Sequence, residues 1–129
     1  MTGDWKPKGY SSVSPYLVVE GAQRVVDFIV EVFDGKILRR YDRFDGSIMH
    51  IEVQIDDTIV VLGNATSTWK PVQSQLHVYV KDVKHAYRRA IDASYVSVSE
   101  PAKKDGDPDR RAGIADPSGN TWWIATQEG

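Results

Sequence analysis

Two ionisable side chains, His50 and Glu52, stand two residues apart in a stretch where polar and apolar residues alternate. On a β-strand, residues at positions i and i+2 point to the same face, so the imidazole and the carboxylate would be neighbours. A carboxylate beside a histidine orients the ring and raises its proton affinity, as a general acid/base group requires. The structural alternative is that polar residues alternate along any strand with one face in solvent. The sequence leaves both interpretations open.

The other two histidines differ in their expected positions. His77 lies on a second predicted strand and is expected to face the same way as His50 and Glu52. Two histidines and one glutamate could then form a site for a divalent metal, although no metal-binding motif contains them. His85 lies in a predicted helix, away from the apolar stripe, and is expected at the surface.

Arg111 follows Arg110 just before the last predicted hairpin. A guanidinium can bind a carboxylate or a phosphate through two parallel hydrogen bonds, so Arg111 is a candidate for an anionic ligand group. Alternation places Arg111 on the cavity side, unless a bulge exchanges it with Arg110. The structural alternative is an ion pair at the edge of the sheet with Asp105, Asp107 or Asp109.

The residues 113–126 contain a turn followed by a strand with two adjacent tryptophans. Asp116 to Gly119 is typical of a turn, and 120–126 is predicted to return as a strand. Because neighbouring residues of a strand point to opposite faces, one indole enters the core and the other faces the opposite side. We expect Trp122 in the core and Trp123 on the open face.

Hydrophobic periodicity predicts the order of the elements that position these residues. In the first half, the predicted elements are a strand at 13–19, a helix with Ala22, Val25, Val26, Ile29, Val30 and Phe33 on one face, and strands at 36–44, 48–55 and 58–62. In the second half, they are a strand at 75–80, a helix capped by Asp82, a strand starting at 96–99, and the two strands of the tryptophan hairpin.

The two halves are therefore an internal repeat. Adding 61 to positions of the first half sets Leu17 against Val78 and Leu62 against Trp123. This predicts one domain, 1–129, with an α+β fold of two βαβββ modules at about 10–64 and 75–126, joined by a linker at 65–74. The helices would cover one face of the sheets, and the other faces would curl around a shared cup.

Strand alternation also predicts which residues face the helices and which face the cup. The residues expected under the helices are Leu17, Val19, Met49, Ile51, Val53, Ile55, Leu76, Val78 and Val80. The residues expected in the cup are Ser14, Tyr16, Val18, His50, Glu52, Gln54, Gln75, His77, Tyr79 and Trp123. A concave aromatic surface with a few polar groups is what a small-molecule pocket needs.

Composition excludes several classes of partner and chemistry. The 129 residues carry 18 acidic and 16 basic side chains, so the formal charge of -2 gives no reason to expect a nucleic acid or an anionic membrane. There is no cysteine, which excludes disulfides and thiolate chemistry. No signal-like or membrane-spanning run is present, and the expected localisation is cytoplasmic.

Several segments together resemble a known family. They are Lys6-Pro7 with Gly9-Tyr10, the run Ser14 to Val19, Met49-His50, Asp109-Arg110, and Asp116-Pro117-x-Gly119-x-x-Trp122 to Thr126. With the two βαβββ modules, they resemble the vicinal oxygen chelate superfamily, which contains glyoxalase I, bleomycin-resistance proteins and extradiol dioxygenases. Within it, the segments are similar to the PhnB-like branch. The resemblance implies the fold, and it implies less about any reaction, because this fold hosts both binding proteins and enzymes.

The resemblance also implies where a metal would be held. Metal-dependent members take their ligands from four strand positions, which fall here at or near Ser14, Leu62, Gln75 and Trp123. None of these residues is a histidine or a carboxylate, and Leu62 and Trp123 cannot ligate a divalent cation. We therefore expect no metal and no other cofactor. A divalent metal with relocated ligands is the alternative.

Two hypotheses of function follow. The first is a metal-independent protein that binds an aromatic or amphipathic small molecule, as bleomycin-resistance proteins do, by stacking on Tyr16, Tyr79 and Trp123, with Gln75, His77 and Arg111 as polar contacts. The alternative is an enzyme, a lyase, isomerase or dioxygenase, that uses His50, Glu52 and His77 with or without a metal. In both cases the resemblance implies a homodimer.

Overall fold

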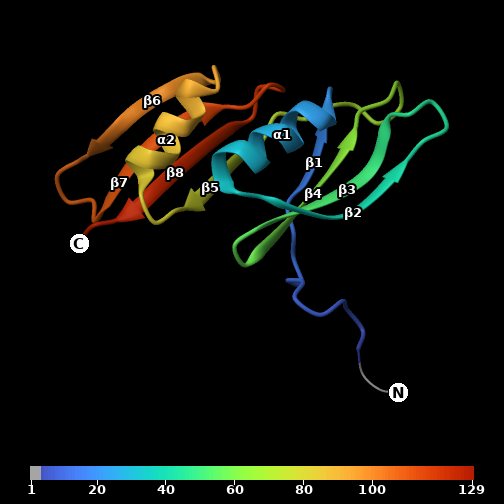
Figure 1. Cartoon of the computed structure of the whole chain (residues 1–129), viewed down its shortest axis with the longest axis horizontal. Helices are drawn as coiled ribbons and strands as arrows, with labels where there is room; N and C mark the ends of the chain where they lie inside the picture. Colours follow the sequence, from blue (N-terminus) through green and yellow to red (C-terminus); the bar gives the residue numbers. More distant parts are fainter. Residues whose placement is uncertain (1–3) are drawn as a thin grey trace.

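The computed structural model describes residues 4–129, which form two consecutive βαβββ modules (Figure 1). Module 1 consists of β1 (Tyr16–Val19), α1 (Ala22–Phe33), β2 (Lys36–Asp42), β3 (Ile48–Ile55) and β4 (Thr58–Asn64). Module 2 consists of β5 (Gln75–Tyr79), α2 (Val83–Asp92), β6 (Val96–Lys103), β7 (Asp109–Ala115) and β8 (Thr121–Gln127). The α+β fold predicted from the sequence is confirmed.

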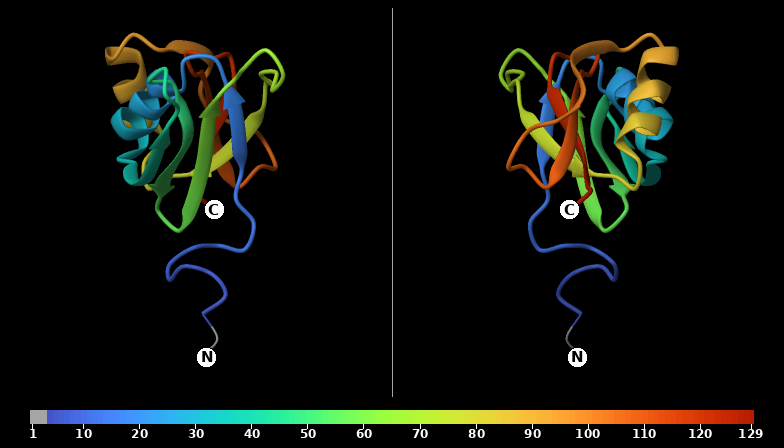
Figure 2. Two further views of the ribbon diagram at one scale, coloured as in Figure 1. Left: turned by 90° about the vertical axis from the view of Figure 1, so that its right-hand side faces the viewer. Right: turned by 90° about the vertical axis from the view of Figure 1, so that its left-hand side faces the viewer.

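Each module forms its own mixed sheet. The strand order is β1-β4-β3-β2 in sheet A and β5-β8-β7-β6 in sheet B. In both sheets the first strand pairs parallel with the last, and the other neighbours pair antiparallel. The two sheets lie side by side, with both helices on the same side of them (Figures 1 and 2). We call the opposite surface of each sheet its helix-free face.

Helix α1 packs a stripe of apolar side chains onto sheet A. Val25 and Ile29 are fully buried, as their spacing predicts. Val30 was predicted in the same stripe, but it is 37% exposed, while Phe28 and Val32 are buried. Each residue turns the helix by about 100°, so the residue after Ile29 points away from the line that Val25, Ile29 and Val32 define. The expectation for Val30 was wrong.

Helix α2 begins with two side-chain caps. The carboxylate of Asp82 accepts a hydrogen bond from the backbone N–H of His85 at 3.2 Å, which confirms the predicted N-cap. The hydroxyl of Thr126 accepts from the N–H of Val83 at 2.8 Å, so β8 fixes the start of the helix. His85 is exposed, as predicted. Within residues 4–129 no helix is long and apolar enough to cross a membrane.

One hydrophobic core joins the modules. Trp122 of β8 is fully buried, and its ring centroid lies 5.5 Å from that of Phe28 on α1. Polar contacts bridge the helices as well, because Arg89 donates two hydrogen bonds to the carboxylate of Asp34, at 3.0 and 2.9 Å. The burial of Trp122 places its neighbour Trp123 on the helix-free face of sheet B.

The predicted core face of the strands is confirmed except at one position. Leu17 and Val19 are buried, and the core residues predicted on β5 pack against the same core. Met49 was expected under α1 but is 46% exposed, and Ile48 is buried instead. The β2–β3 register shifts between Tyr41 and Asp42, opposite this point. Such an irregularity reverses the face of the residues beyond it, which explains the error at Met49.

The repeat is slightly different from a constant offset of 61. Leu17 pairs with Leu62 in sheet A, and His77 pairs with Trp123 in sheet B. Leu62 is fully buried, whereas Trp123 lies on the opposite face, so the predicted equivalence of these two residues was wrong. The residue on β4 that corresponds to Trp123 is Val61, the partner of Tyr16. A shift of one residue exchanges the faces because the side-chain period of a strand is two.

Candidate functional site

The helix-free face of sheet A carries a row of aromatic rings. The ring centroid of Tyr16 lies 5.6 Å from that of Trp69 and 6.1 Å from that of His50, both in edge-on orientations. Trp69 comes from the linker after β4 and lies across Gly63, where a Cβ atom would meet the indole at 3.0 Å. A linker aromatic thus covers part of the face on which Tyr16 and His50 were predicted.

His50 and Glu52 form the contact that their spacing predicts. Nε2 of His50 lies 2.7 Å from Oε2 of Glu52, and the hydroxyl of Tyr10 donates to Oε1 at 2.5 Å. Burial raises the pKa of Glu52, but the hydrogen bonds from His50 and Tyr10 and the charge of Arg39 more than offset this, so the pKa lies below its usual value. An ionised carboxylate only accepts hydrogen bonds, so Nε2 of His50 carries the proton.

Trp123 is held in a fixed position on the helix-free face of sheet B. Its indole Nε1–H donates to Oε1 of Gln75 at 2.8 Å. The ring lies over Gly113 of β7, where a Cβ atom would meet it at 2.8 Å, so the missing side chain lets the indole lie against the strand. His77 and Tyr79 extend the same surface, with ring centroids 4.8 Å apart.

Arg111 is engaged by neighbouring residues. Its guanidinium donates to Asp107 at 2.9 Å and to Asp109 at 3.0 Å, and it approaches Nε2 of His77 at 2.5 Å. Because a guanidinium has no acceptor, Nε2 of His77 must accept this bond. The buried Asp109 also accepts the hydroxyl of Tyr79 at 2.6 Å. This network matches the ion-pair alternative for Arg111, and two carboxylates compensate its charge.

The predicted site residues therefore fall into two groups. Tyr16, His50 and Glu52 lie on sheet A, and Gln75, His77, Tyr79, Arg111 and Trp123 lie on sheet B. Within residues 4–129, no hydrogen bond or ring contact joins the groups. The expected convergence of His77 with His50 and Glu52 does not occur in the chain, because each histidine finds its partner within its own sheet.

The site residues predicted from the sequence do not include three contributors to the sheet A group. Tyr10 reaches Glu52 from the N-terminal arm, Arg39 of β2 lies over the ring of Tyr10, and Trp69 reaches Tyr16 from the linker. Arg39 could have been found, because a hairpin register sets it opposite Glu52. No periodicity locates Tyr10 or Trp69, since neither lies in a helix or strand.

The positions implied for a metal do not offer a ligand set. Gln75 uses its side-chain oxygen for Trp123, and Leu62 is buried in the core. Correcting the register replaces Leu62 by Val61, which cannot ligate a cation either. In the described part of the chain, no group of three or more histidines or carboxylates is arranged to hold a metal ion. The residues at these positions do not fit the metal site of metal-dependent relatives.

Comparison with known proteins defines the family. Residues 12–124 match the sequence profile of the Glyoxalase/Bleomycin resistance protein/Dioxygenase superfamily. The chain is also 30% identical over 125 residues to Mb0911c, an uncharacterized protein of Mycobacterium bovis; the match covers 86% of this chain and 80% of the relative. The chain belongs to the glyoxalase/bleomycin resistance/dioxygenase superfamily.

Solved structures show the same fold. TioX from Micromonospora sp. ML1 superimposes with a TM-score of 0.73 at 23% identity, over 90% of this chain and 95% of TioX. TnmS3, an antibiotic binding protein from Streptomyces sp. CB03234, gives a TM-score of 0.70 at 21% identity, over 92% of this chain and 99% of TnmS3. At these identities the likeness establishes the architecture alone.

Proposed function

We propose that this protein binds an aromatic or amphipathic small molecule on the helix-free faces of its sheets, without a metal. The observation that carries the proposal is the partly exposed indole of Trp123, which is packed against Gly113 and hydrogen-bonded to Gln75 on sheet B. A fixed aromatic surface loses little conformational entropy when a flat ligand stacks on it. The fold shared with TnmS3, an antibiotic binding protein, supports sequestration of a compound of this kind.

The charge around this surface favours neutral or cationic ligands. Arg111 is compensated by Asp107 and Asp109, and Glu52 on sheet A is ionised. An anionic ligand would have to compete with two carboxylates for the guanidinium of Arg111, whereas a neutral ring would not. We therefore propose that Arg111 is a polar contact at the rim and does not bind an anionic ligand group.

Removal of the Trp123 indole tests the proposal. The affinities are measured in a fluorescence screen against aromatic compounds. For every ligand that binds the wild type, Trp123→Ala should weaken the binding free energy by about 2 kcal/mol or more, roughly 30-fold in affinity, because a central tryptophan dominates such contacts. Phe44→Ala is the matched control, since Phe44 is fully exposed in the β2–β3 turn and should leave affinity unchanged. Unchanged affinity in Trp123→Ala would exclude the stacking site.

We further propose that two chains form a homodimer that covers these faces. Tyr16 is 47% exposed and Tyr79 is 62% exposed, so each sheet presents an aromatic ring that a partner chain could cover. A symmetric dimer would let sheet A of each chain face sheet B of its partner and so assemble two cups, each lined by both groups. Light scattering should give twice the chain mass of 14.5 kDa, and a stable monomer would refute this proposal.

A second candidate function is proton transfer, and the contact between His50 and Glu52 favours it. With Nε2 of His50 donating to Glu52, the other ring nitrogen is left with a lone pair and can act as a base. This geometry serves a lyase or an isomerase acting on the same bound ligand. Proton-transfer activity would be established if the wild type converted a ligand of the screen and His50→Gln bound that ligand without converting it.

We also propose that the protein belongs to the PhnB-like branch of its superfamily and that its localisation is cytoplasmic.

A further inference from the structure

Tyr10 lies on the helix-free face of sheet A but belongs to neither sheet. Its phenol hydroxyl donates to Oε1 of Glu52 at 2.5 Å, and the guanidinium carbon of Arg39 lies 5.3 Å from the centre of its ring. Glu52 is only 7% exposed. A carboxylate, a flanking imidazole and a guanidinium thus surround one phenol, which the N-terminal arm supplies.

The hydrogen bonds of Glu52 leave one acceptor for a phenol. Oε2 is taken by His50 on the same strand, so Oε1 is the oxygen that faces Tyr10. Arg39 is 3.8 Å from the same oxygen, too far for a strong hydrogen bond. The hydrogen bond to Glu52 is the main reason that the pKa of Tyr10 is raised, which keeps its hydroxyl protonated as a donor. A neutral phenol fits this place, and a phenolate would be repelled by the carboxylate.

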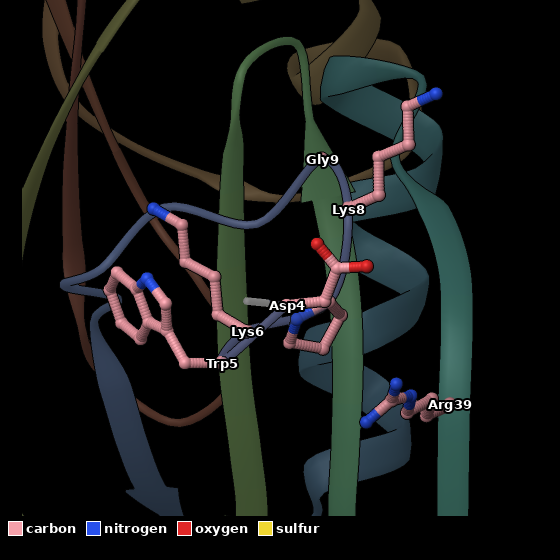
Figure 3. Close-up of a pocket in the computed structure, with 7 residues that line it drawn as sticks. Asp4, Trp5, Lys6, Lys8, Gly9 and Arg39 are labelled. Carbon is pink, nitrogen blue, oxygen red and sulfur yellow. The ribbon is translucent and has the colours of Figure 1, made fainter. Parts of the chain in front are cut away.

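Tyr10 connects the arm to sheet A through its hydrogen bond to Glu52. Nearby, Ser11 makes a long hydrogen bond of 3.4 Å to the carbonyl of Asp57, while Trp5 and Val13 are 78% and 84% exposed. A cavity of about 650 Å³ lies between arm residues 4–9 and Arg39, which points toward the arm from β2 (Figure 3).

We propose that Glu52, His50 and Arg39 form a subsite for a phenolic hydroxyl, that Tyr10 fills it in the free chain, and that phenolic ligands bind by displacing Tyr10. This proposal rests on the proposed binding function. The ligands would be phenols, and Tyr10 would compete with them for the subsite. Tyr10 lowers the apparent affinity for a phenol by the fraction of time that it fills the subsite. If Tyr10 fills it about 90% of the time, removing Tyr10 tightens binding about tenfold.

A matched pair of small probes tests this subsite. 4-Nitrophenol and 4-nitroanisole share the ring and the nitro group, but only the phenol can donate a hydrogen bond to Glu52. Affinities are measured by titration for the wild type, Tyr10→Ala and the double variant Tyr10→Ala/Glu52→Gln. Tyr10→Ala should bind 4-nitrophenol about tenfold more tightly than the wild type, with a much smaller gain for 4-nitroanisole. Glu52→Gln in that background should weaken the binding of 4-nitrophenol about tenfold, because a hydrogen bond to a neutral amide oxygen replaces the stronger one to the carboxylate.

The absorbance of 4-nitrophenol gives a second readout. This probe ionises near neutral pH and absorbs in the visible as the phenolate. Since the subsite takes the neutral form, binding should bleach the phenolate band and should weaken as pH rises through the ionisation of the probe. A bound probe whose phenolate band is undiminished would overturn the inference even if the affinities changed.

The two proposals can fail separately. If both probes bind equally in all variants, or if Tyr10→Ala changes neither, the phenol subsite is wrong, while the Trp123 screen still decides the binding function. If neither probe binds Tyr10→Ala, the subsite is also wrong. Tyr10→Phe is the control for folding, because it keeps the ring beside Arg39 and removes only the hydroxyl. Tyr10→Phe should bind 4-nitrophenol more tightly than the wild type, but by less than Tyr10→Ala does.

Discussion

Replacing Trp122 with alanine should lower the free energy of unfolding by about 3–5 kcal/mol. The indole is fully buried, and its ring lies 5.5 and 5.4 Å from the rings of Phe28 and Phe33 on α1. Truncation would leave a cavity where the two modules share their core. A loss of this size is a large share of the 5–15 kcal/mol that typically separates folded from unfolded domains.

Urea unfolding followed by circular dichroism measures the effect of Trp122→Ala. Trp123→Ala is the matched control. It removes the same kind of side chain from the next residue, which lies on the helix-free face, and should cost about 1 kcal/mol or less. Equal losses in the two variants would contradict the assignment of Trp122 to the core and Trp123 to the open face.

The second large effect is expected at Asp116, the buried carboxylate of the β7–β8 turn. It accepts hydrogen bonds from the backbone N–H groups of Ser118 and Asn120, from the amide of Asn120, and from Nε1 of Trp122. Asp116→Ala leaves these donors without an acceptor. Each donor that water cannot reach should lower the free energy of unfolding by about 1–3 kcal/mol. We expect a loss of about 3 kcal/mol or more.

A second turn of the chain supplies the control for Asp116→Ala. Asp45 accepts two hydrogen bonds from Ser47 in the β2–β3 turn, but it is exposed, so water can replace it. Asp45→Ala should therefore cost well under half as much in the same unfolding experiment. A loss as large for Asp45→Ala as for Asp116→Ala would show that turn geometry, and not burial of the donors, stabilises the hairpin.

The sequence predicts the fold well because its signals are local. The helix spacing of Val25 and Ile29, the cap at Asp82 and the alternation at Trp122 and Trp123 each act within a few residues. Errors arose where pairing between strands decides. Met49 is turned outward by a register shift against β2, and a periodic pattern does not contain the register of its neighbour.

The candidate site was predictable only in part, for the same reason. The pair of His50 and Glu52 follows from a spacing of two, and the structure shows it at 2.7 Å. The hydrogen bond between Tyr10 and Glu52 joins residues that are 42 positions apart. It depends on the path of an arm without regular structure, which no sequence pattern predicts. Arg111 pairs with two aspartates. The sequence alone does not decide between this ion pair and a contact with a ligand.

The most direct test of ligand binding on the helix-free faces is the ¹H–¹⁵N spectrum of the indole groups, titrated with an aromatic ligand from the screen. The chain has 4 tryptophans, which lie in the arm, the linker, the core and the open face of sheet B. We predict that the indole signals of Trp69 and Trp123 shift in proportion to ligand occupancy while that of Trp122 stays in place. Shifts confined to Trp5 or Trp122, with Trp123 unmoved at saturation, would contradict the account.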